Sequence, residues 1–167
     1  MVANQNIEVK RDFQLEGQYK AGANCFYWIA GLSVVNSIVI IWGGDYTLFV
    51  GLAINQVIAG IGAVVAEDLG SLISIITFMF CLIPAGIFFL FGVLANKKYK
   101  SFFIIGMIVY IFDILLYGIY SDLLSIGFHL YILIYMGKGL IALFQLSKMG
   151  KERISNKSTS VTKPYFL

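Results

Sequence analysis

The stretch YIFDILLYGIYSDLLSIGFHLYILIY, residues 110–135, places two apolar runs on either side of a short polar turn at Ser121 and Asp122. The runs and the turn predict two antiparallel helices that pack against each other. Inside these runs lie Asp113 and His129, the only histidine of the chain. An aspartate and an imidazole in such surroundings raise the question of proton transfer or catalysis, and the answer depends on the solvent around the helices.

The composition of the chain indicates that this solvent is lipid. Of 167 residues, 59% are hydrophobic and 13% are charged, and the mean hydropathy is +0.86. Soluble domains have about 45–50% apolar and about 25% charged residues. The apolar runs are continuous rather than alternating, and backbone groups in lipid must then find their partners within helices. The sequence therefore predicts an all-α, polytopic integral membrane protein, with the lipid bilayer as its first partner.

Five apolar segments have about the 20 residues that a helix needs to cross a hydrocarbon core of about 30 Å. They are residues 21–43, 47–66, 71–95, 101–120 and 123–146, of which the second only just reaches this length. We expect these helices to form one transmembrane domain, residues 21–146. Residues 1–20 are predicted to be a polar tail or an interfacial helix, and residues 147–167 a basic, poorly ordered cytoplasmic tail.

Basic residues favour the cytoplasmic side of a membrane, and here they gather at three places. Eleven of them flank the apolar segments: Lys10, Arg11, Lys20, Lys97, Lys98, Lys100, Lys148, Lys151, Arg153, Lys157 and Lys163. If residues 47–66 are re-entrant, both chain ends and the loop at 97–100 share the cytoplasmic side, and all eleven obey the rule. If five segments span, the three N-terminal basic residues lie outside. The C-terminus is cytoplasmic in both arrangements.

A pair of asparagines favours five spans. Asn36 and Asn55 are almost equidistant from the centre of a turn at residues 43–46, so two antiparallel helices joined there would hold both amides at one depth. Such amides can hydrogen-bond between helices in lipid, and small residues on one face of the second segment permit close packing. We therefore favour five spanning helices and keep a re-entrant second segment as the alternative.

The same geometry applies to Asp113 and His129. Each lies eight positions from Ser121, about 12 Å along its helix at about 1.5 Å per residue, so the two side chains should lie level. Tyr110 and Tyr117 share a helical stripe with Asp113, at steps of three and four. We predict a polar seam of these four residues between the last two helices. An isolated charge at this depth costs about 2.5–3.5 kcal/mol, so a partner is expected for each.

Three roles for this seam stay open. It could be a hydrogen-bonded or ion-paired contact that fixes the helix register, a site of proton or ion handling, or a catalytic site. We favour the first, because no nucleophile, phosphate-binding, dinucleotide-binding or metal-binding motif is present. The sequence accordingly predicts no enzyme activity, no metal, no cofactor and no nucleic-acid partner. Cys25 and Cys81 are isolated and are interpreted as small buried hydrophobes.

Four phrases resemble a family of small polytopic bacterial membrane proteins of unassigned function. They are GANCFYWIAGLSVVNSI, FVGLAINQVIAGI, FGVLANKKYKSFFIIGMIVYIFDILLYGI and DLLSIGFHLYIL, which begin at residues 22, 49, 91 and 122. The resemblance implies a compact helical bundle, and it implies no activity, substrate or site. In that family the second segment often has an acid where this chain has Ala59, and this departure weakens any proton path through that segment.

The sequence thus predicts a multi-pass protein of the bacterial plasma membrane that acts without catalysis, through helix packing or by binding a membrane-protein partner or a second copy. The alternative is a small transporter, channel or proton-coupled component that uses Asp113 and His129. A dry, closed seam around these two residues would favour the first hypothesis. A water-accessible cavity that reaches both of them would favour the second.

Overall fold

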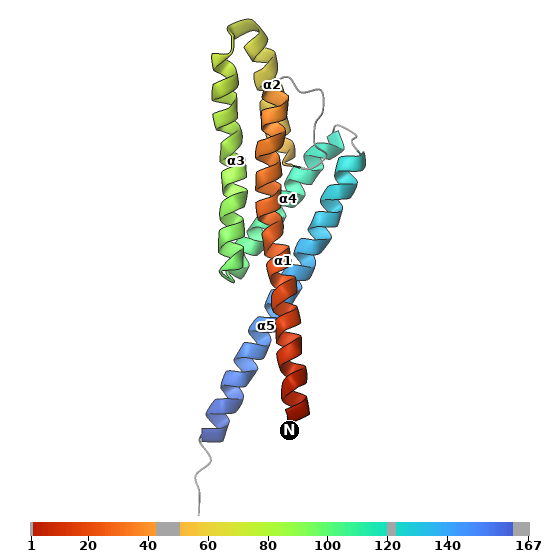
Figure 1. Cartoon of the computed structure of the whole chain (residues 1–167), viewed down its shortest axis with the longest axis vertical. Coiled ribbons are helices and arrows are strands. Elements are labelled where there is room, and N and C mark those ends of the chain that lie inside the picture. Colours follow the sequence, from red (N-terminus) through yellow and green to blue (C-terminus); the bar gives the residue numbers. More distant parts are fainter. Residues whose placement is uncertain (1, 43–50, 120–122, 162–167) are drawn as a thin grey trace, which may run out of the picture.

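The computed structural model describes residues 2–42, 51–119 and 123–161, and in these ranges the chain is helical apart from short connections (Figure 1). The helices are α1 (Val2–Ile41), α2 (Ala53–Leu69), α3 (Leu72–Asn96), α4 (Lys100–Ile119) and α5 (Leu123–Val161). The predicted all-α class is confirmed. The predicted turns at residues 43–46 and 120–122 lie outside the described ranges.

Four of the described helices are long and apolar enough to cross a membrane: α1, α3, α4 and α5. α3 and α4 begin and end within one residue of the predicted segments 71–95 and 101–120. α3 remains helical through Pro84. The four long helices alternate in direction along the bundle (Figure 1), so each apolar run packs against an antiparallel neighbour.

The sequence predicts five spanning helices, and α2 is not among the four candidate spans. It begins at Ala53 and has 17 residues, at the lower limit of the about 17–25 that a span needs. The N–H of Leu52 bonds to Ser33, eight residues before the end of α1, and the N–H of Ala53 bonds to Asp113, six residues before the end of α4. At about 1.5 Å per residue, α2 therefore starts about 9–12 Å inside the ends of its neighbours. The first part of the predicted segment, residues 47–50, lies outside the described ranges.

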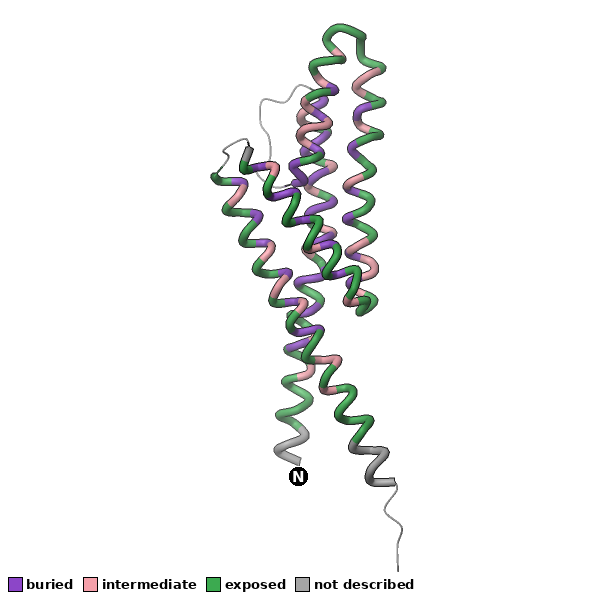
Figure 2. The backbone as a smooth tube through the Cα atoms, turned by 180° about the vertical axis from the view of Figure 1, so that it is seen from behind, coloured by how far each residue is buried: buried purple, intermediate pink, exposed green. Residues whose placement is uncertain are grey.

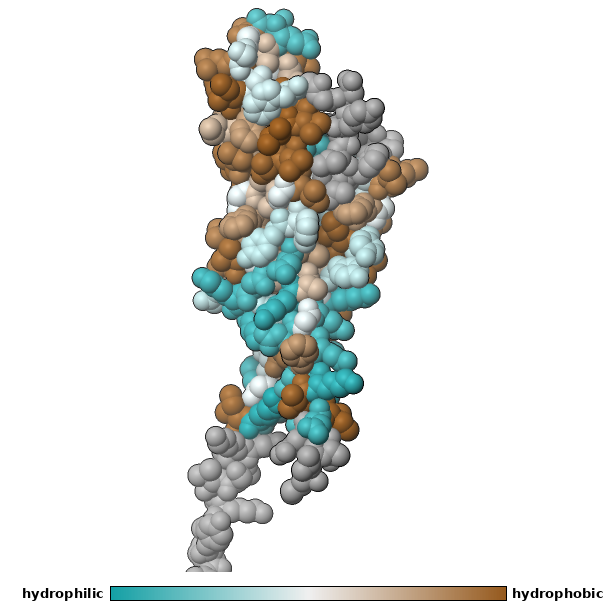
Figure 3. Space-filling model, in the orientation of Figure 1, coloured by the Kyte–Doolittle hydropathy of each residue, from teal (hydrophilic) through white to brown (hydrophobic). Residues whose placement is uncertain are grey.

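The start of α1 and the end of α5 lie at the same end of the bundle, and the turn between α2 and α3 lies at the opposite end (Figure 1). The hydropathy of the surface also differs between the two ends of the bundle. Hydrophobic side chains gather over the upper part of the molecule, below a hydrophilic tip, and hydrophilic ones predominate where α1 and α5 extend beyond the other helices (Figure 3).

α1 covers residues 2–20, where the sequence predicts a polar tail or an interfacial helix, and α5 continues to Val161, into the predicted C-terminal tail. The extension is explained by packing, because Leu15 and Tyr19 of α1 are buried in a cluster that includes Leu146 and Met149 of α5. Burying one such side chain contributes about 1.5–3 kcal/mol. Arg153 adds ion pairs to the same two-helix contact, with Asp12 at 2.7 Å and Glu8 at 4.0 Å; exposed pairs of this kind add little. Residues 162–167 lie outside the described ranges.

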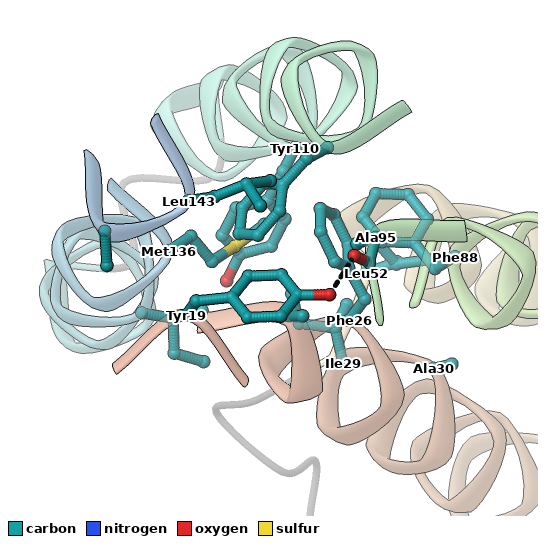
Figure 4. Packing of buried hydrophobic residues seen from close by; sticks show 14 of the residues in the cluster. Tyr19, Phe26, Ile29, Ala30, Leu52, Phe88, Ala95, Tyr110, Met136 and Leu143 are labelled. Atoms are coloured by element: carbon teal, nitrogen blue, oxygen red, sulfur yellow. Dashed lines mark hydrogen bonds between the residues drawn. The ribbon is translucent and has the colours of Figure 1, made fainter. Parts of the chain in front are cut away.

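The main core lies between the four long helices (Figures 2 and 4). Phe26 of α1 stands at its centre, with ring centroids 5.5 Å from Phe103 of α4 and 6.3 Å from Phe88 of α3. Tyr19 closes the core at one end, where its hydroxyl donates to the carbonyl of Ala95 at 2.7 Å (Figure 4). The last carbonyls of a helix lack intrahelical partners, so Tyr19 ties α1 to the end of α3.

α1 and α5 cross at Gly22 and Gly139. A Cβ atom on Gly139 would lie 2.7 Å from the Cα atom of Gly22, and the reverse distance is the same. Real Cβ atoms do not approach a backbone this closely, so the crossing requires glycine on both helices. Small residues at such contacts let two helices in a membrane approach backbone to backbone.

We expect Gly139→Ala to destabilise the bundle by about 1–3 kcal/mol, because the added methyl group forces the two backbones apart. The matched control is Gly137→Ala on the same helix, where a Cβ meets no heavy atom within 4 Å. Alanine at that position should be neutral or stabilising, since it is the better helix former by about 0.8–1.0 kcal/mol. The measurement is the thermal unfolding midpoint in detergent. Equal midpoints for the two variants would contradict the glycine requirement.

Candidate functional site

The first turn of α2 is capped by a side chain from another helix. The carboxylate of Asp113, on α4, accepts hydrogen bonds from the backbone N–H of Ala53 at 2.9 Å and of Ile54 at 3.1 Å. The first N–H groups of a helix lack intrahelical partners and carry a partial positive charge. Leu52, at the N-cap position, has no side chain that could serve them. Asp113 is only 5% exposed, so carboxylate and N–H groups satisfy each other in a buried place.

His129 contacts the residue just before that turn. Its Nε2 lies 2.7 Å from the carbonyl oxygen of Gly51, and its Nδ1 lies 2.7 Å from the carbonyl oxygen of Ser125, one turn earlier in α5. The imidazole is completely buried. Buried polar atoms need partners, and here both ring nitrogens meet main-chain carbonyls.

Two tyrosines of α4 enclose this imidazole. The ring centroid of Tyr110 lies 5.4 Å from that of His129, and the ring centroid of Tyr117 lies 4.5 Å away. The Tyr117 hydroxyl donates to the carbonyl of Gly51 at 3.3 Å, while the Tyr110 hydroxyl has no hydrogen-bond partner among the described residues. Both tyrosines are buried. The structure therefore brings all four predicted seam residues together between α4 and α5.

The backbone conformation at residue 51, just before α2, favours glycine. Gly51 has a φ of +154°, a value that favours glycine, and a Cβ atom there would lie 3.4 Å from the Cα atom of Ser33. The next N–H, that of Leu52, donates to the Ser33 hydroxyl at 2.7 Å. Segment 51–54 is thus held from three sides, by α1, α4 and α5.

The predicted contact between Asp113 and His129 is made through this segment. No ion pair joins the two side chains among the described contacts. Each binds main-chain groups of residues 51–54 instead, where the carboxylate meets N–H groups and the imidazole meets a carbonyl. The reason is that α2 begins inside the bundle, so its unpaired main-chain groups lie between the two side chains.

The predicted amide contact between Asn36 and Asn55 is replaced by a different one. Both residues are buried. The side-chain N–H groups of Asn55 donate to the Ser37 hydroxyl at 3.3 Å and to the carbonyl of Cys81 at 3.0 Å. Its Oδ1 has no hydrogen-bond partner among the described residues. Asn55 therefore links α2 to both α1 and α3. Its partner on α1 is Ser37, the residue after the predicted Asn36.

Asp113 also lines a cavity of about 500 Å³ between α2, α3 and α4. The other lining residues are apolar: Ile54, Pro84, Ile87, Phe88, Val109, Phe112, Leu115 and Leu116. Its volume falls within the about 300–1,000 Å³ of typical ligand pockets. Phe112 and Leu115 are more than 60% exposed, so the cavity opens on the outer surface of the helices. His129 is not among the lining residues, and the cavity reaches only one member of the predicted pair.

Sequence reasoning missed Leu52 and Ser33, and it interpreted Gly51 only as a small residue on the packing face of the second segment. A signal for Ser33 was present, because Ser33 and Ser37 lie four residues apart and form a polar stripe within an apolar segment. A glycine inside an apolar run also indicates a close backbone approach, and this was the available sign at Gly51.

No protein-family model matches the chain, and neither a curated protein nor a solved structure matches it. The resemblance to small polytopic bacterial membrane proteins therefore stays an expectation. The roles of the site residues follow from their contacts alone.

We expect Asp113→Leu to destabilise the protein more than Asp113→Asn. Leucine leaves two buried N–H groups without an acceptor, at about 1–3 kcal/mol for each group, whereas asparagine keeps one carbonyl oxygen. Thermal unfolding midpoints in detergent should fall in the order wild type, Asp113→Asn, Asp113→Leu. Phe112→Leu, at an exposed neighbouring position on α4, is the control and should leave the midpoint almost unchanged. If both Asp113 variants melt with the wild type, the cap does not stabilise α2.

Proposed function

We propose that the chain is a non-catalytic, multi-pass protein of the bacterial plasma membrane. Its spans are α1, α3, α4 and α5, its α2 is re-entrant, and both ends of the chain are cytoplasmic. The polar seam anchors the start of α2, and the bundle acts by packing against a membrane-protein partner or a second copy. The observation that carries the proposal is that Asp113 and His129 both bind the main chain of residues 51–54.

These contacts support a structural role for the seam. A general acid or base must come within hydrogen-bonding reach of the group that it serves. Both carboxylate oxygens of Asp113 and both ring nitrogens of His129 are instead directed at main-chain groups. An unpaired main-chain group in lipid costs several kcal/mol, and this cost is by itself sufficient reason for two polar side chains at this depth.

The distribution of charge supports the orientation. With four spans, the described basic residues of the three groups lie at the same end of the bundle, and the acidic pair Glu67 and Asp68 lies at the other. This arrangement satisfies the preference of lysine and arginine for the cytoplasmic side at every connection. The start of α2 inside the bundle supports re-entrance, because a chain that crossed there would begin its helix at the membrane surface.

A groove between α1 and α3 supports the partner-binding part of the proposal. Small residues from both helices line it, among them Ala30, Gly31, Ala85 and Gly86, and its volume is about 260 Å³. Small residues admit close approach by another transmembrane helix, where packing rather than hydrophobicity drives association.

The topology can be tested with single cysteines in a chain that carries Cys25→Ser and Cys81→Ala. Trp42→Cys and Asp68→Cys lie at exposed positions and are expected to react with a membrane-impermeant maleimide from the same side. Lys98→Cys, also exposed, is the control and should react from the opposite side. Five spanning helices would instead place positions 42 and 68 on opposite sides, and that labelling pattern would refute the re-entrant α2.

A proton-coupled role is the second candidate, favoured by the cavity that reaches Asp113. Its test is proton flux into liposomes that contain the purified chain, driven by a potassium diffusion potential. The structural proposal predicts the same flux as in empty liposomes, for the wild type and for Asp113→Asn alike. A flux well above that background, abolished by Asp113→Asn while the variant remains folded, would establish the second candidate instead.

A further inference from the structure

The surroundings of His129 contain acceptors on both sides of the ring. Nε2 faces the carbonyl of Gly51 and Nδ1 faces the carbonyl of Ser125, each at 2.7 Å. A carbonyl oxygen only accepts hydrogen bonds, and a neutral imidazole has a single N–H group. A neutral ring would therefore donate on one side and direct a lone pair at a carbonyl on the other. An imidazolium donates on both sides and satisfies both contacts.

Two tyrosine rings beside His129 support the same state. Tyr110 stacks on His129 with an interplanar angle of 23° and a centroid distance of 5.4 Å, and the ring of Tyr117 is tilted by 49° at a centroid distance of 4.5 Å. A cation within about 6 Å of an aromatic centroid is attracted by the negative face of the ring. The imidazole thus has two aromatic rings beside it and a carbonyl oxygen at each ring nitrogen, surroundings that suit a cation.

A carboxylate binds the same segment. Asp113 accepts hydrogen bonds from the N–H groups two and three residues after Gly51, whose carbonyl faces His129. The other titratable groups at the site are Tyr110 and Tyr117 of α4, and Cys25 of α1 interacts with Tyr110. A positive ring and a negative carboxylate attract each other, which offsets part of the cost of placing each charge inside the membrane.

We propose that His129 is a buried proton-binding site that holds a second proton, with Asp113 as its counter-ion and residues 51–54 as the bridge between them. The proton comes from water, and the ring binds it without any other bond changing. This goes beyond the anchoring role, because a neutral histidine could also hold α2 through one N–H group.

The test uses the fact that the chain contains one histidine. Full-length protein labelled with ¹⁵N-histidine is reconstituted in lipid bilayers, and the protons on the two ring nitrogens are detected by ¹⁵N–¹H NMR at neutral pH. We expect two N–H signals from the ring. One N–H signal together with one unprotonated nitrogen would overturn the proposal, and this measurement needs no variant.

Two variants test the counter-ion. In Asp113→Asn the charge is lost, and the ring is expected to fall from two N–H signals to one at the same pH. Tyr117→Phe is the matched control, because it keeps the aromatic face and the charge but removes the hydroxyl, and it should keep both signals. Two ring N–H signals in Asp113→Asn would exclude Asp113 as the counter-ion. This measurement counts the protons on the ring and does not report stability. The proposal of a second proton can therefore be refuted while the anchoring role of Asp113 and His129 at α2 remains valid.

Discussion

Main-chain groups that are buried away from water need hydrogen-bond partners within the protein, and this constraint governs the start of α2. A helix that begins at the end of a bundle can leave its first N–H groups to water, but α2 begins about 9–12 Å inside the ends of its neighbours. There Asp113, Ser33 and His129 take the place of water around residues 51–54. Together with Tyr117, which donates to the carbonyl of Gly51, they bring side chains from three helices to a segment of four residues, and the position of α2 follows from these bonds.

The bundle is held together differently in its two halves. Most of the described buried polar side chains surround the start of α2: Ser33, Asn36, Ser37, Asn55, Asp113, Ser125 and His129. Thr77 packs against Gly62, further along α2. The other half is packed by Phe26, Phe103 and Met136, with Tyr19 as its polar edge. Apolar packing is tolerant of small shifts, whereas hydrogen bonds in a low-dielectric medium depend strongly on geometry. The polar half therefore defines the position of α2.

Much of this arrangement could be predicted from the sequence. The lengths of the apolar runs gave the bounds of α3 and α4, and the spacing about Ser121 brought Asp113 and His129 to one depth. The start of α2 could not be predicted, because the residues before Ala53 are as apolar as those of a span. The extensions of α1 and α5 beyond the other helices were not predicted because these segments are mostly polar. Their few buried apolar residues do not stand out from the sequence of a solvated tail.

The glycine contact between α1 and α5 has a mechanical consequence. With no side chain between Gly22 and Gly139, two long helices meet backbone to backbone near the middle of each. A rotation of the helices about this crossing would separate them on both sides of it. On the outer side, the ion pair of Asp12 with Arg153 and the burial of Leu15 and Tyr19 oppose this rotation, so these outer contacts also help to keep the helices together around α2.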